Sequence, residues 1–266
     1  MNEAQILAAA QSLLVAEQTG QQRGLLSLDH PGMTLDEAYA VQRAVVGAKL
    51  AMGRRQIGWK IGLTSRAMQQ ALNITTPDSG VLLDDMLFAD GAVVPAGRFI
   101  QPRIEAEIAF IMGADLGGGH VTRADVVAAT AHVAPSLEIL DTRILRADPA
   151  TGRARIITDT VSDNAANAGV VLGVPRHALG AFDLRWVGAV VTRDGVVEET
   201  GLGAGVLNDP VMGIVWLVQR LAAYGMGLRA GDIVLSGSFI RPIEAIPGSR
   251  FDADFGAFGR VGIGFA

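Results

Sequence analysis

The sequence predicts an α+β fold in which a helical N-terminal portion precedes a β-rich core. Two observations support this prediction. Apolar residues recur at helical spacing in residues 3–18 and again after Thr34, whereas the chain from Val81 onward consists mainly of short apolar runs divided by Gly, Pro and Asp. Short strands that outnumber helices favour a mixed, β-rich fold over a doubly wound sheet. We therefore expect a single catalytic domain over residues 1–266, helical over 1–55 and β-rich over 56–266.

Each predicted element is delimited by residues that start or stop it. Thr34 and Glu37 form a capping-box pattern, and Gly53 ends the apolar stripe that follows them. Pro210 opens the last helix, and Gly225 follows its end. The predicted helices cover residues 3–18, 34–53, 123–131 and 211–223. The predicted strands cover residues 81–83, 93–94, 106–112, 133–140, 168–173, 184–192, 232–236, 250–254 and 260–265, and a shorter one runs into a turn over 58–65.

Composition and charge exclude several classes of protein. Only 18% of the residues are charged and the formal net charge is −5, whereas a nucleic-acid-binding surface normally needs a basic excess. The absence of cysteine excludes disulfides, thiolate catalysis and zinc–thiolate sites. No apolar run approaches the roughly 18 residues of a membrane span, and Glu3 stands where a signal peptide would be basic. We expect a cytoplasmic protein without a nucleic-acid or membrane partner.

Three glutamates are the first candidates for a metal site. Glu105 and Glu107 alternate with apolar residues, so on a strand both carboxylates project from one face. Glu138 lies in a second apolar, strand-like run, where a carboxylate is rarely buried unpaired. A solvated acidic face is the alternative for Glu105 and Glu107 alone. All three together predict a site for a hard cation, Mg²⁺ or Mn²⁺, because no cysteine is available and no histidine has ligand spacing.

Two further charged residues could serve such a site. Lys60 lies in an uncharged, strand-like stretch and could supply a positive charge or transfer a proton. A surface lysine that extends its charge into water is the alternative. Asp84 follows the predicted strand 81–83, a position where loops often deliver catalytic groups. A plain acidic turn is the alternative for Asp84.

Two polar runs could contact a ligand. The first covers residues 162–169 and begins with Ser162; it could donate hydrogen bonds to a ligand or form an Asx-rich turn. The second, 236–239, contains Ser238 and follows a predicted strand. Its backbone N–H groups and hydroxyls could face an anion, and a simple tight turn is the alternative.

In combination these motifs resemble the hydratase/decarboxylase group of the fumarylacetoacetate hydrolase superfamily. The resemblance covers the chain from about Ser27 to the C-terminus. It rests on Gly58-Trp59-Lys60-Ile61-Gly62-Leu63-Thr64-Ser65, Pro102-Arg103-Ile104-Glu105-Ala106-Glu107, Glu138 and Ser236-Gly237-Ser238-Phe239. It implies a mixed β-roll core and a large homo-oligomer, typically a decamer. It also implies that Glu105, Glu107 and Glu138 hold Mg²⁺ or Mn²⁺, that Lys60 is the active-site lysine, and that Asp84 and Ser238 line the pocket.

The resemblance further implies a metal-dependent lyase that acts on an unsaturated 2-oxo acid. The run 162–169 and the Asp148-Pro149 segment are most similar to members that hydrate 2-oxo-hept-4-ene-1,7-dioate in the homoprotocatechuate meta-cleavage pathway. Hydration of 2-oxopent-4-enoate and decarboxylation of 4-oxalocrotonate are the alternatives, and a non-catalytic partner in a decarboxylase–hydratase complex is an alternative of a different class. In the expected mechanism Lys60 stabilises an enolate or transfers a proton, and Asp84 helps to position water.

The far carboxylate of a dioic substrate needs a cation or N–H donors. Arg143 and Arg241 are candidates for this role, with Arg241 the one assigned to substrate binding. Ordinary surface or structural ion pairs are the alternative for each arginine taken singly.

Overall fold

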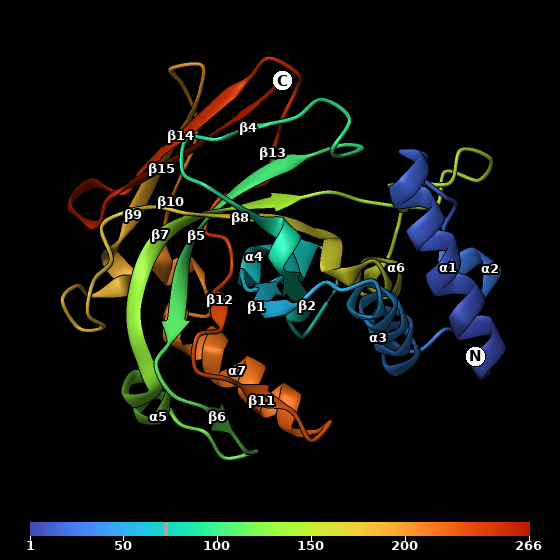
Figure 1. Ribbon diagram of the computed structural model, residues 1–266, viewed down its shortest axis with the longest axis horizontal. Helices are drawn as coiled ribbons and strands as arrows, with labels where there is room; N and C mark the ends of the chain where they lie inside the picture. The colour runs from blue at the N-terminus through green and yellow to red at the C-terminus, as the bar shows by residue number, and fades with distance from the viewer. Residues whose placement is uncertain (72–73) are drawn as a thin grey trace.

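The computed structural model describes residues 1–71 and 74–266. The N-terminal helices lie to one side, and two curled sheets form most of the remainder (Figure 1). The predicted α+β class is confirmed. Among the described residues, no helix has both the length and the apolar character that crossing a membrane requires.

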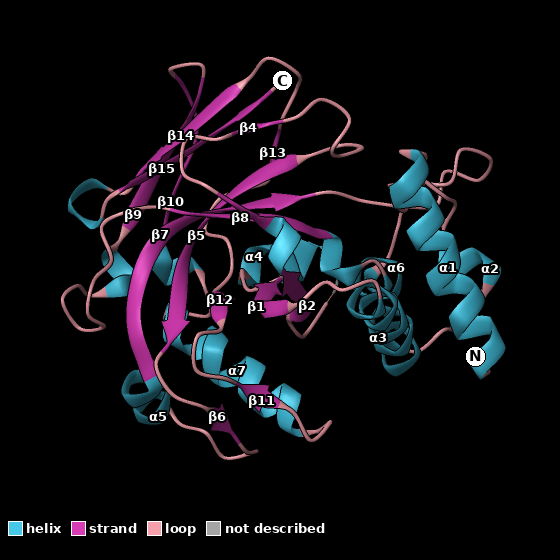
Figure 2. Ribbon diagram, in the orientation of Figure 1, coloured by secondary structure: helices cyan, strands magenta, loops and turns pink. Residues whose placement is uncertain are grey.

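Figure 2 shows where the helices and strands lie in the fold. The helices and 3₁₀ turns are α1 (Glu3–Thr19), α2 (Leu26–Asp29), α3 (Leu35–Ala51), α4 (Arg66–Ala71), η1 (Asp84–Met86), α5 (Arg123–Ala129), α6 (Ile157–Ser162), η2 (Asn164–Ala166), η3 (Leu184–Trp186), η4 (Gly203–Gly205), α7 (Pro210–Ala222) and η5 (Gly256–Phe258). The strands are β1 (Gln56–Gly62), β2 (Asp78–Leu83), β3 (Leu87–Phe88), β4 (Val93–Val94), β5 (Arg103–Met112), β6 (Leu116–Gly117), β7 (Thr130–Leu140), β8 (Asn167–Leu172), β9 (Gly188–Arg193), β10 (Val196–Leu202), β11 (Gly227–Leu228), β12 (Ile233–Leu235), β13 (Ile243–Glu244), β14 (Arg250–Asp254) and β15 (Arg260–Phe265).

The larger sheet contains the longest strands of the fold. Its order is β2-β1-β12-β5-β7-β8-β3, and β13 pairs with the start of β5. β5 and β7 run antiparallel with Ile104 opposite Ile139. β1 and β12 pair in parallel although they are far apart in the sequence. This arrangement makes β1, β12, β5 and β7 successive neighbours in one sheet, although they come from separate parts of the sequence.

The main core lies on one face of β5. Ile104, Ala106 and Ile108 are fully buried there and pack with residues of the second sheet, such as Phe251, and of α7, such as Leu217. The second sheet has the order β10-β9-β14-β15-β4. Because successive side chains alternate across a strand, the odd-numbered residues of β5 must point away from this core.

The N-terminal helices form a smaller core of their own. α1 and α3 share an apolar cluster that includes Leu13 and Val45. Capping boxes at Asn2 and Thr34 open the two helices, so the start predicted at Thr34 is confirmed. Both helices therefore combine a strong local start signal with apolar burial.

Several predicted boundaries differ from the observed ones. The strand predicted over 184–192 begins only at Gly188, because Asp183 caps residues 184–186 as a 3₁₀ turn. The helix predicted over 123–131 ends at Ala129, where β7 takes over. The sequence does not predict β10, an edge strand whose polar and apolar residues are all at least partly exposed and show no clear alternation.

Candidate metal centre and active site

Three carboxylates from β5 and β7 meet on one face of the larger sheet. Glu105 lies directly opposite Glu138 in the antiparallel register, and Glu107 follows on the same face. One carboxylate oxygen of each residue lies within 4.8 Å of the corresponding oxygens of the other two. The structure therefore brings together the three glutamates that the sequence indicates as metal ligands.

Three oxygens of this cluster are buried and accept no hydrogen bond from a described residue. Within the described part of the chain, both oxygens of Glu138 and Oε1 of Glu107 are buried without a hydrogen-bond partner. Oε2 of Glu107 accepts a hydrogen bond of 2.7 Å from the N–H of Gly237. Buried carboxylate oxygens are rarely left without a compensating group. An all-carboxylate donor set with free oxygens fits a hard divalent cation such as Mg²⁺, Mn²⁺ or Ca²⁺.

Burial, together with the proximity of like charges, changes the protonation of the three carboxylates. Burial is the largest cause and raises the pKa of all three; for Glu105 and Glu107 the negative charge of Glu138 adds to the effect. The pKa of Glu105 rises to about 8. Without a cation the cluster consequently retains protons at neutral pH, and a cation that binds must displace them.

Lys60 of β1 adds a positive charge to the cluster. Its Nζ lies 3.4 Å from Oε1 of Glu138, and its side chain is only 4% exposed. Burial alone would lower the pKa of Lys60, but Glu138 and the other nearby carboxylates outweigh burial and raise the pKa. Lys60 is therefore a buried ammonium group, and the surface-lysine alternative is wrong.

Asp78 belongs to the same group of charges, although no sequence motif singles it out. It begins β2 and is buried, and the antiparallel register places it opposite Gly62 of β1. A Cβ on Gly62 would overlap the Asp78 carboxylate and would lie 3.1 Å from Nζ of Lys60. Burial raises the pKa of Asp78, and the charge of Lys60 opposes that rise. The available signal was an acidic residue two positions before the apolar run 80–83.

A left-handed turn packs against β2 beside these charges. Residues 164–166 all have φ between 51° and 58°, a region that costs a non-glycine residue about 1 kcal/mol or more. The side chain of Asn164 accepts from the N–H of Val81 at 2.8 Å and donates to its carbonyl at 2.9 Å. A buried ion pair of 2.5 Å between Arg143 and Asp163 precedes the turn. The predicted polar run 162–169 thus holds the strand that carries Asp78.

Two of the predicted site residues make their contacts elsewhere. Asp84 lies in η1, where its side chain accepts hydrogen bonds of 3.1 Å from the backbone N–H and the Nε of Arg55. Ser162 is fully buried in α6, where its hydroxyl donates to the carbonyl of Thr158 at 2.8 Å. The structure does not bring either side chain into contact with the carboxylates.

Ser238 lies in the turn that reaches the cluster through its backbone. Its hydroxyl donates to the carbonyl of Ile240 at 2.9 Å and so closes the turn. The preceding residue, Gly237, contacts Glu107 through its N–H and has a φ of 116°. A Cβ at this position would overlap the side chain of Thr64. The turn therefore supplies a backbone donor to the cluster, and glycine is needed for it.

Both arginines proposed for a distal carboxylate are engaged in ion pairs. Arg143 is buried and paired with Asp163. Arg241 is 79% exposed, and its Nε donates to Glu199 at 2.8 Å. Neither guanidinium contacts the carboxylate cluster.

Comparison with known proteins places the chain in a family. Residues 53–262 match the model described as fumarylacetoacetate (FAA) hydrolase, C-terminal. The chain belongs to the fumarylacetoacetate hydrolase family. It is 50% identical over 256 residues to a 2-oxo-hept-4-ene-1,7-dioate hydratase of Escherichia coli, and the match covers 96% of each chain. It is 38% identical to a 2-keto-4-pentenoate hydratase of Paraburkholderia xenovorans (strain LB400), over 95% of this chain and 92% of the relative.

Solved structures show the same fold. The 4-oxalocrotonate decarboxylase from Pseudomonas putida G7, complexed with magnesium and adipate, matches with a TM-score of 0.94 and 32% identity over 100% of this chain and 99% of that chain. The same enzyme complexed with calcium and acetate matches with a TM-score of 0.93. The N-terminal helices are thus part of the shared fold.

Proposed function

We propose that this protein is a metal-dependent hydratase that adds water to 2-oxo-hept-4-ene-1,7-dioate, giving 4-hydroxy-2-oxo-heptane-1,7-dioate in aromatic meta-cleavage catabolism. The observation that carries the proposal is the buried cluster of Glu105, Glu107 and Glu138 with Lys60 beside it. Identity of 50% to a hydratase of this substrate, over nearly the whole chain, supports the choice of reaction and substrate.

The proposed cofactor is Mg²⁺ or Mn²⁺, held by the three glutamates. Their unpartnered buried oxygens support this assignment, as does the magnesium in a structure of similar fold. When bound, such an ion stabilises negative charge that develops on the oxygens of a 2-oxo acid.

Lys60 and Asp78 are the proposed catalytic residues of the chain itself. The net reaction adds a proton at C5 and a hydroxyl at C4 of the substrate. Lys60, a buried ammonium, would stabilise negative charge on the C2 oxygen. Asp78, whose pKa is raised by burial, would hold a proton or orient the attacking water. Asp78 takes the role expected of Asp84, because the Asp84 carboxylate is engaged by Arg55.

Decarboxylation of 4-oxalocrotonate is the second candidate, since a decarboxylase of that substrate shares the fold with a TM-score of 0.94. Product analysis separates the two. The purified protein is loaded with Mg²⁺ and given the heptenedioate, 2-oxopent-4-enoate and 4-oxalocrotonate in turn, with a chelator-treated sample as control. We expect a 4-hydroxy-2-oxo product, formed fastest from the heptenedioate. Evolution of CO₂ from 4-oxalocrotonate as the fastest reaction would favour the decarboxylase, and no turnover of any substrate would contradict both.

We also propose a homo-oligomer, with a decamer as the expected size. Light scattering of the purified chain tests this proposal, and a monomer would refute it.

A further inference from the structure

The strand that carries Asp78 lies at the edge of its sheet. β2 is the first strand in the order of the larger sheet, so in the described part of the chain its strand neighbour is β1 alone. In an antiparallel pair, the backbone N–H and C=O groups of alternate residues point away from the partner strand. Ser79 and Val81 of β2 are buried, and buried backbone groups need hydrogen-bond partners. The partners of these two residues therefore determine how firmly the edge is held.

Side chains take the place of a neighbouring strand along this edge. The N–H of Ser79 donates to Oη of Tyr39 at 3.2 Å, and Nε2 of Gln42 donates to the carbonyl of Ser79 at 2.9 Å. Asn164 pairs in the same way with both backbone groups of Val81. Tyr39 and Gln42 both belong to α3, which lies beside β2 (Figure 1). The helical N-terminal portion thus completes the edge of a strand in the β-rich core.

The two side chains of α3 are themselves held in place. Tyr39 is 6% exposed and Gln42 is 3% exposed. The guanidinium carbon of Arg220 lies 4.5 Å from the centre of the Tyr39 ring. Nε2 of Gln42 also donates to the carbonyl of Val161 in α6 at 3.0 Å. Buried polar networks with satisfied partners are rigid, so these side chains can fix the backbone of Ser79 in one position.

Fixing Ser79 also fixes the catalytic carboxylate before it. Asp78 directly precedes Ser79, and its side chain leaves the opposite face of β2, where the charge of Lys60 acts on it. Asp78 is the first residue of β2, and the ends of an element open more readily than its centre. A displacement of about 1 Å at a reacting group can lower a rate about 100-fold. The hold on Ser79 therefore matters most for the placement of Asp78.

We propose that Tyr39 and Gln42 are positioning residues of the reaction, which hold Ser79 so that the Asp78 carboxylate stays beside Lys60. The inference rests on the proposed function for the catalytic role of Asp78. Both residues act through β2, since their hydrogen bonds to this strand go to Ser79. α3 ends at Ala51, before the match to the family model begins at residue 53. The proposal thus gives the helical N-terminal portion a part in catalysis.

Amide hydrogen exchange tests the hold on β2 without turnover. Exchange is measured by mass spectrometry on the full chain with Mg²⁺ present, in peptides that cover β2 and β5. We expect Tyr39→Phe and Gln42→Met each to accelerate exchange in β2 about fivefold or more, the factor that corresponds to the loss of one hydrogen bond. Exchange in β5 should stay at the wild-type rate, because the glutamate strand has other neighbours.

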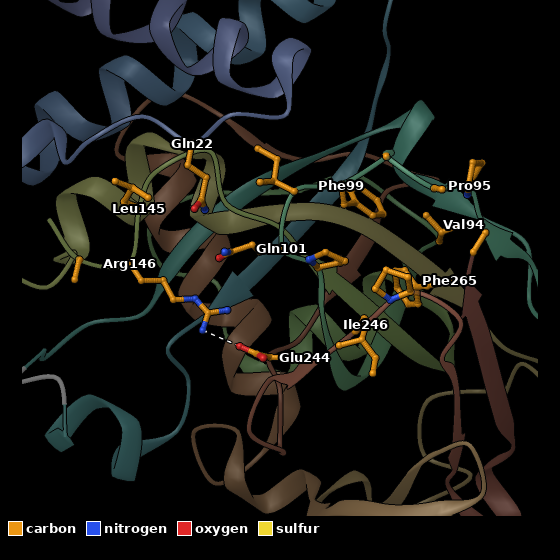
Figure 3. A pocket seen from close by; sticks show the side chains of 18 residues that line it. Gln22, Val94, Pro95, Phe99, Gln101, Leu145, Arg146, Glu244, Ile246 and Phe265 are labelled. Carbon is orange, nitrogen blue, oxygen red and sulfur yellow. Dashed lines mark hydrogen bonds and ion pairs between the residues drawn. The ribbon is translucent and has the colours of Figure 1, made fainter. Parts of the chain in front are cut away.

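Each variant has a matched control. Tyr224→Phe removes the hydroxyl of the other tyrosine in the chain, which donates to exposed Asp36 at 2.8 Å. Gln101→Met changes a glutamine in a pocket of about 530 Å³ (Figure 3), whose lining in the described part of the chain includes no residue of α3 or β2. Both controls should exchange and turn over like wild type, and melting temperatures check that every variant folds.

Turnover in a double-mutant cycle tests the consequence for catalysis. Rates are measured well below each melting temperature, on the substrate that wild type converts fastest. We expect Tyr39→Phe to lower kcat about tenfold while KM changes less than about twofold. In an Asp78→Asn background the same substitution should change kcat less than about twofold, because the carboxylate that Tyr39 positions is gone.

Three results would overturn the inference: wild-type exchange of β2 in Tyr39→Phe, a wild-type kcat in that variant, or an equal loss of kcat in the Asp78→Asn background. A lowered melting temperature with a wild-type kcat would show that Tyr39 serves stability alone. Failure of the proposed function looks different, because it is read from the product. CO₂ released from 4-oxalocrotonate as the fastest reaction would refute the hydratase, and the exchange rates and the kcat ratios of the cycle would still decide the roles of Tyr39 and Gln42.

Discussion

Replacing Glu107 by Gln should have opposite effects on the metal-free and the metal-loaded protein. The substitution keeps the shape of the side chain and its acceptor for the N–H of Gly237, which lies 2.7 Å from Oε2. It removes a carboxylate whose pKa is raised by burial and by Glu138 and Glu105. Metal-free protein should gain stability, because a buried charge without a partner is replaced by a neutral group.

The magnitudes follow from the burial of the cluster. A buried charged group without a partner costs roughly 1–3 kcal/mol or more, and a chain of this length gains about 2 °C in Tm per kcal/mol. We expect metal-free Glu107→Gln to melt about 2–6 °C above metal-free wild type at alkaline pH, where the raised pKa of Glu107 destabilises wild type most. Saturating Mg²⁺ at 100 times Kd stabilises wild type by about 2.7 kcal/mol, or about 5 °C. The variant, with one of three ligands lost, should show almost no Mg²⁺ shift.

Thermal unfolding by circular dichroism, with and without Mg²⁺ after chelator treatment, measures both effects. Glu198→Gln is the control, because Glu198 of β10 pairs with Arg193 of β9 outside the cluster. It should reproduce the wild-type Mg²⁺ shift. An equal Mg²⁺ shift in wild type and Glu107→Gln would refute the assignment of the cluster as the metal site. A metal-free variant less stable than wild type would refute the argument from unpartnered charge.

Three further predictions test the charges of the fold. Lys60→Met should lower kcat about 100-fold or more while the Mg²⁺-induced Tm shift remains; a wild-type rate would remove Lys60 from the mechanism. The folded-state pKa of Glu105 is raised from 4.5 to about 8, so its contribution to metal-free stability is full below pH 4.5 and is lost as the pH rises to about 8. Mg²⁺ affinity should accordingly increase from about pH 6 to 8 with proton release, which calorimetry in buffers of different ionisation enthalpy measures; binding without proton release would contradict it. Arg143→Met should cost about 3–5 kcal/mol in chemical unfolding because Asp163 stays buried without its partner, and Asp163→Asn in the same chain should recover part of that loss; a cost below about 1 kcal/mol would show that the pair is dispensable.

The cluster of three glutamates could be predicted because it follows from the period of a strand. Glu105 and Glu107 alternate with residues that fill the core, so the sequence alone places both on one face. Glu138 is visible as a carboxylate inside an apolar run. What brings it opposite Glu105 is the register of β5 and β7, which the alternation of both strands favours. The same local signals give the helix start at Thr34.

Asp78 and the turn at residues 164–166 could not be predicted in the same way. Asp78 meets Lys60 because β1 and β2 pair, and nothing local to Asp78 reports that pairing. The left-handed conformation of Ala165 and Ala166 conflicts with the usual preference of alanine. It is held by the side chain of Asn164, which accepts a hydrogen bond from Val81 and donates one to it, although Val81 is more than 80 residues away. Backbone strain of this kind is stabilised by tertiary contacts, and local conformational preferences do not predict it.

The sequence alone does not identify an arginine that could bind the distal carboxylate of a dioic substrate. Arg143 and Arg241 were candidates by charge alone, and the structure gives each an acidic partner. The strand period that identifies Glu107 applies equally in the other direction and leads from Glu105 to Arg103. The sequence does not show which end of that face is open, because openness is set by neighbours that come from distant strands. Burial of Ala109 and Leu235 at one end, and partial exposure of Arg103 at the other, supply that direction.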